Sequence, residues 1–122
     1  MLVFGGNLME ASVLQELKER LLYLKHEIMS RIKENTDKVN KIMIRGDEGD
    51  FSDAVYTKDI LYDLLEKDRQ HLREIEESLY SIEKGDYGRC RMCGKDIEIE
   101  RMKAKPTAKY CIKCRAVVEG KR

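Results

Sequence analysis

The sequence predicts a mainly α-helical fold: a long antiparallel coiled-coil hairpin, then a small cysteine-bearing head and a short C-terminal helix. Three observations support this prediction. Charged residues make up 39% of the 122-residue chain and aromatic residues only 7%, a composition typical of long, solvated helices. Two stretches carry apolar residues at heptad spacing, and all four cysteines lie within residues 90–114.

Two heptad series predict the two long helices. The first is spaced by 3, 4, 3 and 4 residues and comprises Leu14, Leu17, Leu21, Leu24 and Ile28. It loosens through Arg31 and Asn35 before apolar residues return at Val39 and Ile42. The second series alternates gaps of 4 and 3 and comprises Leu61, Leu65, Asp68, Leu72, Ile75, Leu79 and Ile82, with Asp68 as its one polar member. Two such helices can cover each other's apolar stripe, which predicts an antiparallel hairpin over residues 12–84.

The ends of the helices are expected at turn-forming residues. The link at residues 46–53 contains two glycines and four acids, and glycine disfavours helix. Ser52 or Asp53 is the expected N-cap of the returning helix, which should end at Gly85. Residues 1–11 are expected to form an N-terminal tail.

The cysteines are paired as Cys90-x-x-Cys93 and, after seventeen residues, Cys111-x-x-Cys114. Two residues between thiolates allow a tight turn to direct both sulfurs at one point, and two such turns complete a tetrahedron around zinc. Four protein ligands leave no open coordination position. The spacing therefore predicts one structural Zn²⁺ within a head of residues 85–122.

Other cysteine chemistries are less consistent with the sequence. Two disulfides need an oxidising compartment, and the chain shows no export signal. A thioredoxin-like motif needs a βαβ unit, which the pattern lacks. An iron–sulfur cluster could use the same four thiolates, but the regular pairing favours zinc.

Local patterns predict the rest of the head. The alternating Ile97-Glu98-Ile99-Glu100 suggests a short strand. The bond between Lys105 and Pro106 requires extended backbone at Lys105. Thr107 is then the expected cap of a last helix that carries Cys111 and Cys114.

Charge and hydropathy bear on partners and compartment. Residues 1–84 carry a net charge of −5 and residues 85–122 a net charge of +6. Neither part is basic enough to make sequence-specific DNA binding the expected function. No apolar run approaches the ~18 residues of a membrane span, and no signal peptide is evident. We expect a soluble, cytoplasmic protein.

The head resembles a known family. Its pattern is Cys90-x-x-Cys93-Gly94-x-x-Ile97-x-x-x-Arg101-Met102-x-Ala104-x-Pro106-x-Ala108-x-x-Cys111-x-x-Cys114. This is similar to the DksA/TraR C4-type zinc-finger proteins, bacterial factors that bind RNA polymerase. Met102 stands where leucine is usual, a tolerable apolar exchange. The resemblance is dense over residues 83–115 and architectural elsewhere.

The resemblance implies a function. Such proteins bind at the polymerase secondary channel, insert the coiled coil toward the active site and destabilise open promoter complexes. Guanosine tetraphosphate often potentiates them in the stringent response. The resemblance thus implies a monomeric transcription regulator that catalyses no reaction itself.

Two groups of residues correspond to functional positions of the family. The tip motif Asp-x-x-Asp-x-Ala aligns without gaps with Asp47, Asp50 and Ser52, so both acids match and the alanine does not. Taken without the resemblance, this acidic link is also consistent with a simple solvated turn. For the nucleotide, the family's basic positions correspond to Lys67 and Arg115, whereas Glu74 stands where a lysine is expected. A carboxylate there would repel a polyphosphate.

Two other function classes remain open. The first is a nucleic-acid-binding zinc finger with a coiled-coil handle, supported by the basic residues Arg89, Arg91, Lys103, Lys105 and Lys109. A steep salt dependence of DNA affinity would identify it. The second is a thiol oxidoreductase that uses both cysteine pairs, which would require a reactive thiol.

Overall fold

The computed structural model describes residues 2–4, 7–45 and 51–120. It divides into two compact units. The first, named here the head unit, contains residues 1–24 and 74–122. The second, the arm unit, contains residues 25–73.

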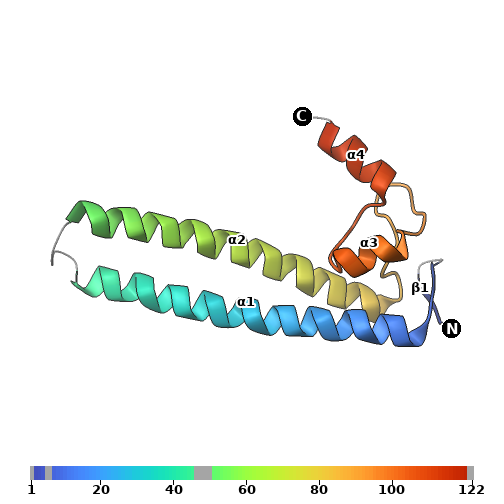
Figure 1. The fold of residues 1–122 in the computed structure, drawn as a ribbon, viewed down its shortest axis with the longest axis horizontal. Coiled ribbons are helices and arrows are strands. Elements are labelled where there is room, and N and C mark those ends of the chain that lie inside the picture. The colour runs from blue at the N-terminus through green and yellow to red at the C-terminus, as the bar shows by residue number, and fades with distance from the viewer. Residues whose placement is uncertain (1, 5–6, 46–50, 121–122) are drawn as a thin grey trace. The chain divides into compact units, whose positions relative to one another are not determined.

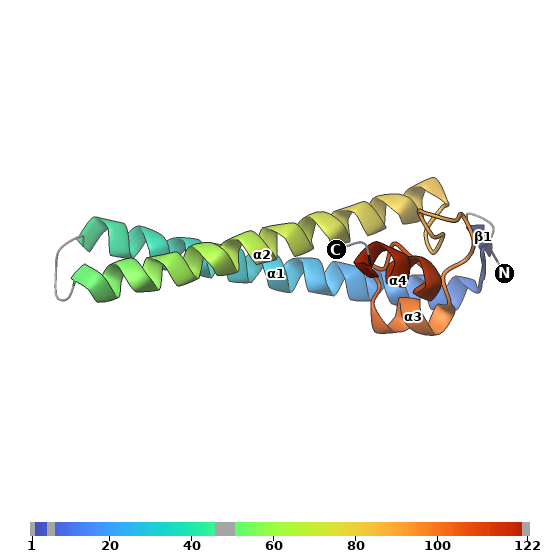
Figure 2. The same cartoon turned by 90° about the horizontal axis from the view of Figure 1, so that it is seen from above.

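Two long helices form most of both units. Helix α1 spans Ala11–Arg45 and helix α2 spans Phe51–Lys84. Within each unit the two helices lie side by side and antiparallel (Figures 1 and 2). The predicted mainly α-helical fold with a long antiparallel hairpin is confirmed.

The start of α2 differs from the sequence prediction. The helix begins at Phe51, so Ser52 and Asp53 lie in its first turn and neither is the N-cap. Serine and aspartate favour caps but are also tolerated in a first turn, where an acidic residue interacts favourably with the helix dipole.

The end of α2 is at the predicted place. Gly85 follows the last helical residue and has a φ of 86°, in the left-handed region that glycine adopts without strain. Its backbone N–H donates to the carbonyl oxygen of Ser81 at 2.9 Å, and the N–H of Asp86 donates to the same oxygen at 3.1 Å. This arrangement satisfies carbonyl groups that a helix C-terminus leaves without partners.

The arm unit has an apolar core formed by both helices. Val39, Leu61 and Leu65 are buried together, with Ile32 and Ile42 packed against them. All of them except Ile32 come from the two heptad series. The core confirms that the apolar stripes of α1 and α2 face each other.

The one polar member of the second series has a charged partner. Arg31 on α1 donates two hydrogen bonds to the Asp68 carboxylate on α2, Nε to Oδ2 at 3.0 Å and Nη2 to Oδ1 at 2.8 Å. The Asp68 side chain is 13% exposed and the Arg31 side chain 53%. The hydrogen bonds from Arg31 hold the pKa of Asp68 below its usual value.

This lowered pKa gives a pH-dependent contribution to stability. A carboxylate with a depressed folded-state pKa stabilises the fold above its unfolded pKa of about 3.9. At neutral pH we expect the free energy of unfolding of the wild type to exceed that of an Asp68→Asn variant by about 1–2 kcal/mol. The hydrogen bonds from Arg31 are charge-assisted, which favours a larger difference, but Arg31 is half-exposed, which reduces it. Urea unfolding of both proteins between pH 3 and 7 should show this difference shrinking as the pH falls below about 4. A constant difference would contradict the assignment.

The head unit has its own core. Leu17 and Leu21 of α1, Ile75 of α2 and Met102 of the zinc-finger segment each have 0% exposure. Tyr87 is 3% exposed, and its hydroxyl donates to the carbonyl oxygen of Pro106 at 2.8 Å. Burial raises the pKa of Tyr87 well above its usual value. Within the head unit, the zinc-finger segment therefore packs on α1 and α2 through large apolar side chains.

Two short helices replace part of the predicted pattern in the head. Helix α3 spans Ile99–Ala104 and helix α4 spans Ile112–Gly120. The strand predicted over residues 97–100 is wrong, because α3 begins inside it. Alternation over four residues is too short to identify a strand, and the following Glu-Arg-Met-Lys-Ala run consists of good helix formers.

The prediction for the last helix was partly wrong. Lys105 is extended as expected, with φ −140° and ψ 90°. Thr107 is buried, but α4 begins only at Ile112, so Thr107 does not cap it. Cys111 stands immediately before the helix and Cys114 lies in its first turn.

The N-terminal residues contain strands where a tail was expected. Strand β1 (Leu2–Phe4) pairs antiparallel with strand β2 (Asn7–Met9). The sequence signal was present, because a β-prone Leu-Val-Phe run precedes a Gly-Gly dipeptide that is typical of hairpins. In the described part of the chain, no helix is both long enough and apolar enough to cross a membrane.

Candidate metal centre and basic cavity

The four cysteines meet at one point of the head unit. The sulfurs of Cys90, Cys93, Cys111 and Cys114 all lie within 4.8 Å of one another, and those of Cys93 and Cys111 are 3.9 Å apart. A tetrahedral site with Zn–S bonds of about 2.3 Å requires sulfurs about 3.8 Å apart. The donor set and its spacing therefore fit one zinc ion with four thiolate ligands.

The first cysteine pair is held by a tight turn. The N–H of Gly94 donates to the carbonyl oxygen of Cys90 at 3.0 Å, and the N–H of Cys90 donates to that of Lys95 at 2.8 Å. Gly94 has a φ of 77°, which a side chain would strain. An isolated bridge between Arg89 and Asp96 closes the base of this turn.

The second pair is held by the start of α4. The N–H of Arg115 donates to the carbonyl oxygen of Cys111 at 2.9 Å, so Cys111 directly precedes the first helical turn. The two halves of the finger are joined by a backbone hydrogen bond from the N–H of Arg91 to the carbonyl oxygen of Lys109, at 2.9 Å. Backbone hydrogen bonds thus position each cysteine pair locally, and one of them also joins the two halves of the finger.

The thiols differ in acidity. Burial would raise the pKa of Cys90, but backbone hydrogen bonds from Cys93, Cys111 and Met92 bring it down to about 6. Burial, together with the neighbouring sulfurs, raises the pKa of Cys114 to about 12. Four thiolates this close repel one another, and a divalent cation removes that repulsion while favouring their deprotonation. The electrostatics of the site are those of a closed, structural metal centre.

Side chains connect the finger to both long helices. Glu77 on α2 accepts an ion pair from Lys109 Nζ at 2.8 Å and lies 3.8 Å from Arg91 Nη1. Arg20 on α1 donates a hydrogen bond to the carbonyl oxygen of Lys103, in α3. The metal centre is therefore attached to α1 through one half of the finger and to α2 through both.

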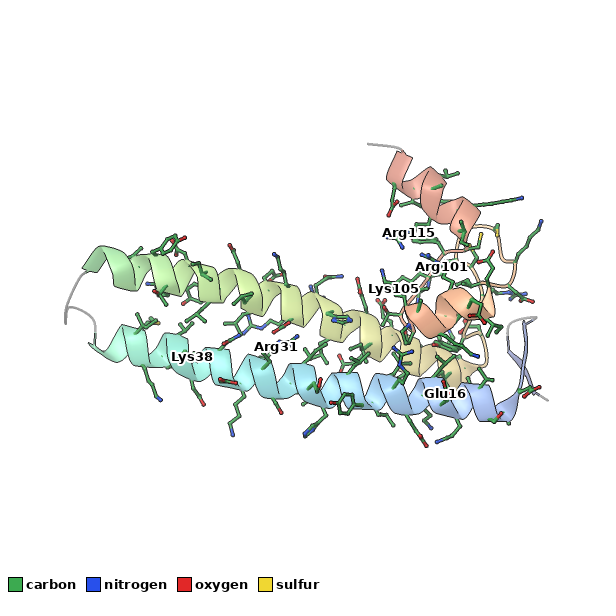
Figure 3. The ribbon with its side chains drawn as sticks, viewed as in Figure 1. Glu16, Arg31, Lys38, Arg101, Lys105 and Arg115 are labelled. Atoms are coloured by element: carbon green, nitrogen blue, oxygen red, sulfur yellow. The ribbon has the colours of Figure 1, made fainter. Side chains whose placement is uncertain are left out.

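A second feature of the head is a basic cavity of about 270 Å³. Its charged lining residues are Glu74, Arg101, Lys105, Lys109, Arg115 and Glu119. Arg101, Lys105 and Arg115 come from α3, the segment after it and α4, and they gather on one side of the head (Figure 3). Arg115 pairs with Glu119 at 2.7 Å, and Arg101 donates to the carbonyl oxygen of Tyr110 at 2.9 Å. The cavity thus has four cations and two carboxylates.

The structure describes only some of the residues that were predicted to have a function. Asp47 and Asp50 lie outside the described residues, and Ser52 lies in α2, where its side chain is not described. Lys67 belongs to the arm unit, whereas Arg115 belongs to the head unit and lines the cavity. These assignments remain predictions.

Sequence reasoning did not single out Arg101 and Lys105 as partners of Arg115. The available signal was their spacing of four residues across the end of a helix, followed by a proline that turns the chain. The third partner is ten residues further on, so only the fold of the finger brings it to the same cavity.

Comparisons with known proteins identify the family. The model of the prokaryotic DksA/TraR C4-type zinc finger matches residues 85–120. An uncharacterized protein of Aquifex aeolicus is 34% identical over 91% of this chain and 79% of its own length. This chain belongs to the DksA/TraR zinc-finger family.

Other similar proteins extend the comparison. YteA of Bacillus subtilis is 40% identical over 78% of this chain, and the RNA polymerase-binding transcription factor DksA of Escherichia coli is 39% identical over 44%. The alignments span only 44% and 36% of those two proteins. The structure of transcription factor DksA2 from Pseudomonas aeruginosa matches with a TM-score of 0.84 and 26% identity, over 92% of this chain and 87% of that one.

Proposed function

We propose that this chain is a transcription regulator that binds RNA polymerase at its secondary channel. In this proposal the hairpin enters the channel and the acidic link between the helices approaches the active site. Open promoter complexes are then destabilised without any reaction catalysed by the regulator. The fold match to DksA2 over 92% of the chain carries the proposal.

The dimensions of the helices support this proposal. Helix α1 has 35 residues and α2 has 34, so each is about 50 Å long at 1.5 Å rise per residue. Residues 46–50 connect them, which puts Asp47 and Asp50 in the connection between two long helices. A buried apolar seam stiffens the hairpin, and a stiff hairpin can carry acidic groups into a narrow channel.

The zinc centre supports a structural role for the head. With four thiolates and no open position, the metal organises the fold and provides no catalytic site. We propose that the head binds the outer face of the polymerase and that the protein acts as a monomer in the cytoplasm. Sequence-specific DNA binding is not part of the proposal.

The lifetime of open complexes at a ribosomal RNA promoter tests the function. With polymerase of the same organism, we expect the wild type to shorten the lifetime several-fold and Asp50→Asn to restore most of it. Removing one tip charge alters the interaction near the active site without touching the zinc centre. Asp59→Asn, an exposed acid on α2, is the matched control and should act like the wild type.

The outcome separates the function classes. No effect of a folded, zinc-loaded protein on lifetime would exclude the proposal. DNA binding that weakens steeply with salt would then favour the nucleic-acid-binding alternative. Full activity of Asp50→Asn would remove the tip from the mechanism while keeping polymerase binding.

The basic cavity supports a nucleotide site of reduced affinity. We propose that Arg115 contacts guanosine tetraphosphate and that Arg101 and Lys105, which line the same cavity, add positive charge. Glu74 lines the same cavity, and its carboxylate opposes a polyphosphate. The lifetime assay repeated with the nucleotide should therefore show little further shortening.

A further inference from the structure

A polar layer interrupts the apolar seam of the arm unit. The 3–4 spacing of the first heptad series continues from Ile28 to Arg31 and then to Asn35. Both polar residues thus occupy seam positions of α1, and Asp68 occupies a seam position of α2. Taken as whole residues, Asn35 is 8% exposed and Asp68 9%. These two residues are therefore buried between the helices, and the half-exposed Arg31 reaches Asp68 from the edge of the seam.

The two charged residues of this layer form a direct ion pair. Arg31 contacts both carboxylate oxygens of Asp68, at 2.8 and 3.0 Å. Figure 3 shows Arg31 between the two helices, directed from α1 toward α2. A two-point contact between a planar guanidinium and a carboxylate has a narrow geometry, so this contact depends on the alignment of the helices.

The apolar residues alone do not determine that alignment. Because leucine and isoleucine recur in both series with gaps of 3 and 4, sliding one helix by seven residues again places apolar side chains opposite apolar side chains. The same shift would place Arg31 and Asp68 opposite apolar residues, so that Asp68 would be buried without its partner. Unpaired buried charge is strongly unfavourable, so the pair penalises an arm unit in which the helices are shifted by one heptad.

We propose that the Arg31–Asp68 pair specifies the alignment of α1 and α2 in the arm unit. The two residues are positioning residues: they select one pairing of the helices, and apolar residues in their place would hold the hairpin together equally well. This inference does not rest on polymerase binding, since the alignment is a property of the free protein.

The test measures the distance between spin labels on the two helices. The labels are placed on ketone-bearing amino acids introduced at Lys41 and Asp63, which are exposed, so that the zinc-binding cysteines stay unmodified. In the wild type we expect one narrow distance distribution. In an Arg31→Leu, Asp68→Leu double variant we expect additional distances, from sliding by one heptad, or about 10 Å along the helix.

Two further variants make the result decisive. The charge-swapped protein, Arg31→Asp with Asp68→Arg, should recover a single distribution because the pair is restored in reverse. Glu34→Ala with Lys38→Ala removes an exposed ion pair within α1 and should leave the distribution unchanged. The double-leucine variant should melt no lower than the wild type, which separates lost alignment from unfolding.

Either of two results would overturn the proposal. A double-leucine variant with the single distance of the wild type would show that the apolar residues suffice. A charge-swapped variant with several distances would show that the pairing of these two charges is not the specifying contact.

Discussion

Replacing Cys111 with serine should release zinc and unfold the head unit. Serine is a poor zinc ligand, and the three remaining sulfurs would be left close together without a cation that offsets their mutual repulsion. Structural zinc contributes about 10–16 kcal/mol in zinc-finger peptides, and that binding energy is folding energy. A loss of this size is comparable to the whole stability of a domain, which is typically about 5–15 kcal/mol.

Zinc content and thermal unfolding together check this prediction. We expect less than one zinc per chain in the Cys111→Ser protein and loss of the near-ultraviolet signal of Tyr87, whose packing depends on the head. Met92→Ser is the matched control, because Met92 lies between two of the cysteines and is 46% exposed. That control should bind one zinc and melt like the wild type. An unchanged melting profile of Cys111→Ser would contradict a structural metal.

Replacing Leu21 with alanine should cost about 2–5 kcal/mol of unfolding free energy. Leu21 has 0% exposure in the head unit, so the truncation removes buried methyl groups and leaves a cavity that the surrounding side chains cannot fully close. The neighbouring Leu22 is 47% exposed. Leu22→Ala should change stability by about 0.5 kcal/mol or less, as exposed substitutions do.

Urea unfolding of the two variants tests the assignment of the buried seam. Because the two leucines are adjacent and both become alanine, the variants change helix propensity and the unfolded chain to the same extent. Equal losses for Leu21→Ala and Leu22→Ala would contradict the direction in which α1 presents its apolar stripe. A larger loss of unfolding free energy in Leu22→Ala would show that α1 buries the face that carries Leu22 instead.

The sequence was sufficient for features that repeat or that need special backbone. Heptad spacing identified both long helices, since helices with a 3–4 apolar repeat bury their apolar stripes by pairing. Gly85 marked the end of α2 because few other residues adopt its positive φ. The paired cysteine spacing predicted the metal centre, because the tetrahedral ligand geometry of zinc restricts how cysteines can be spaced.

Short segments and distant partners were harder. Over Ile97–Glu100, the sequence pattern fits both a short strand and the start of a helix. The helix forms because it buries Met102 in the core of the head unit. Asp68 appeared as a defect in the heptad pattern until the structure placed Arg31 beside it. The basic cavity was not predicted because its residues are brought together by the path of the chain around the cysteines.

Glu77 gives the metal an influence beyond its ligands. One carboxylate on α2 holds Lys109, which precedes the second cysteine pair, and approaches Arg91, which lies within the first. Because Lys109 and Arg91 belong to the two halves of the finger, both contacts with Glu77 depend on the fold that zinc stabilises. The electrostatic potential at this point of α2 therefore depends on the metal as well as on the local sequence.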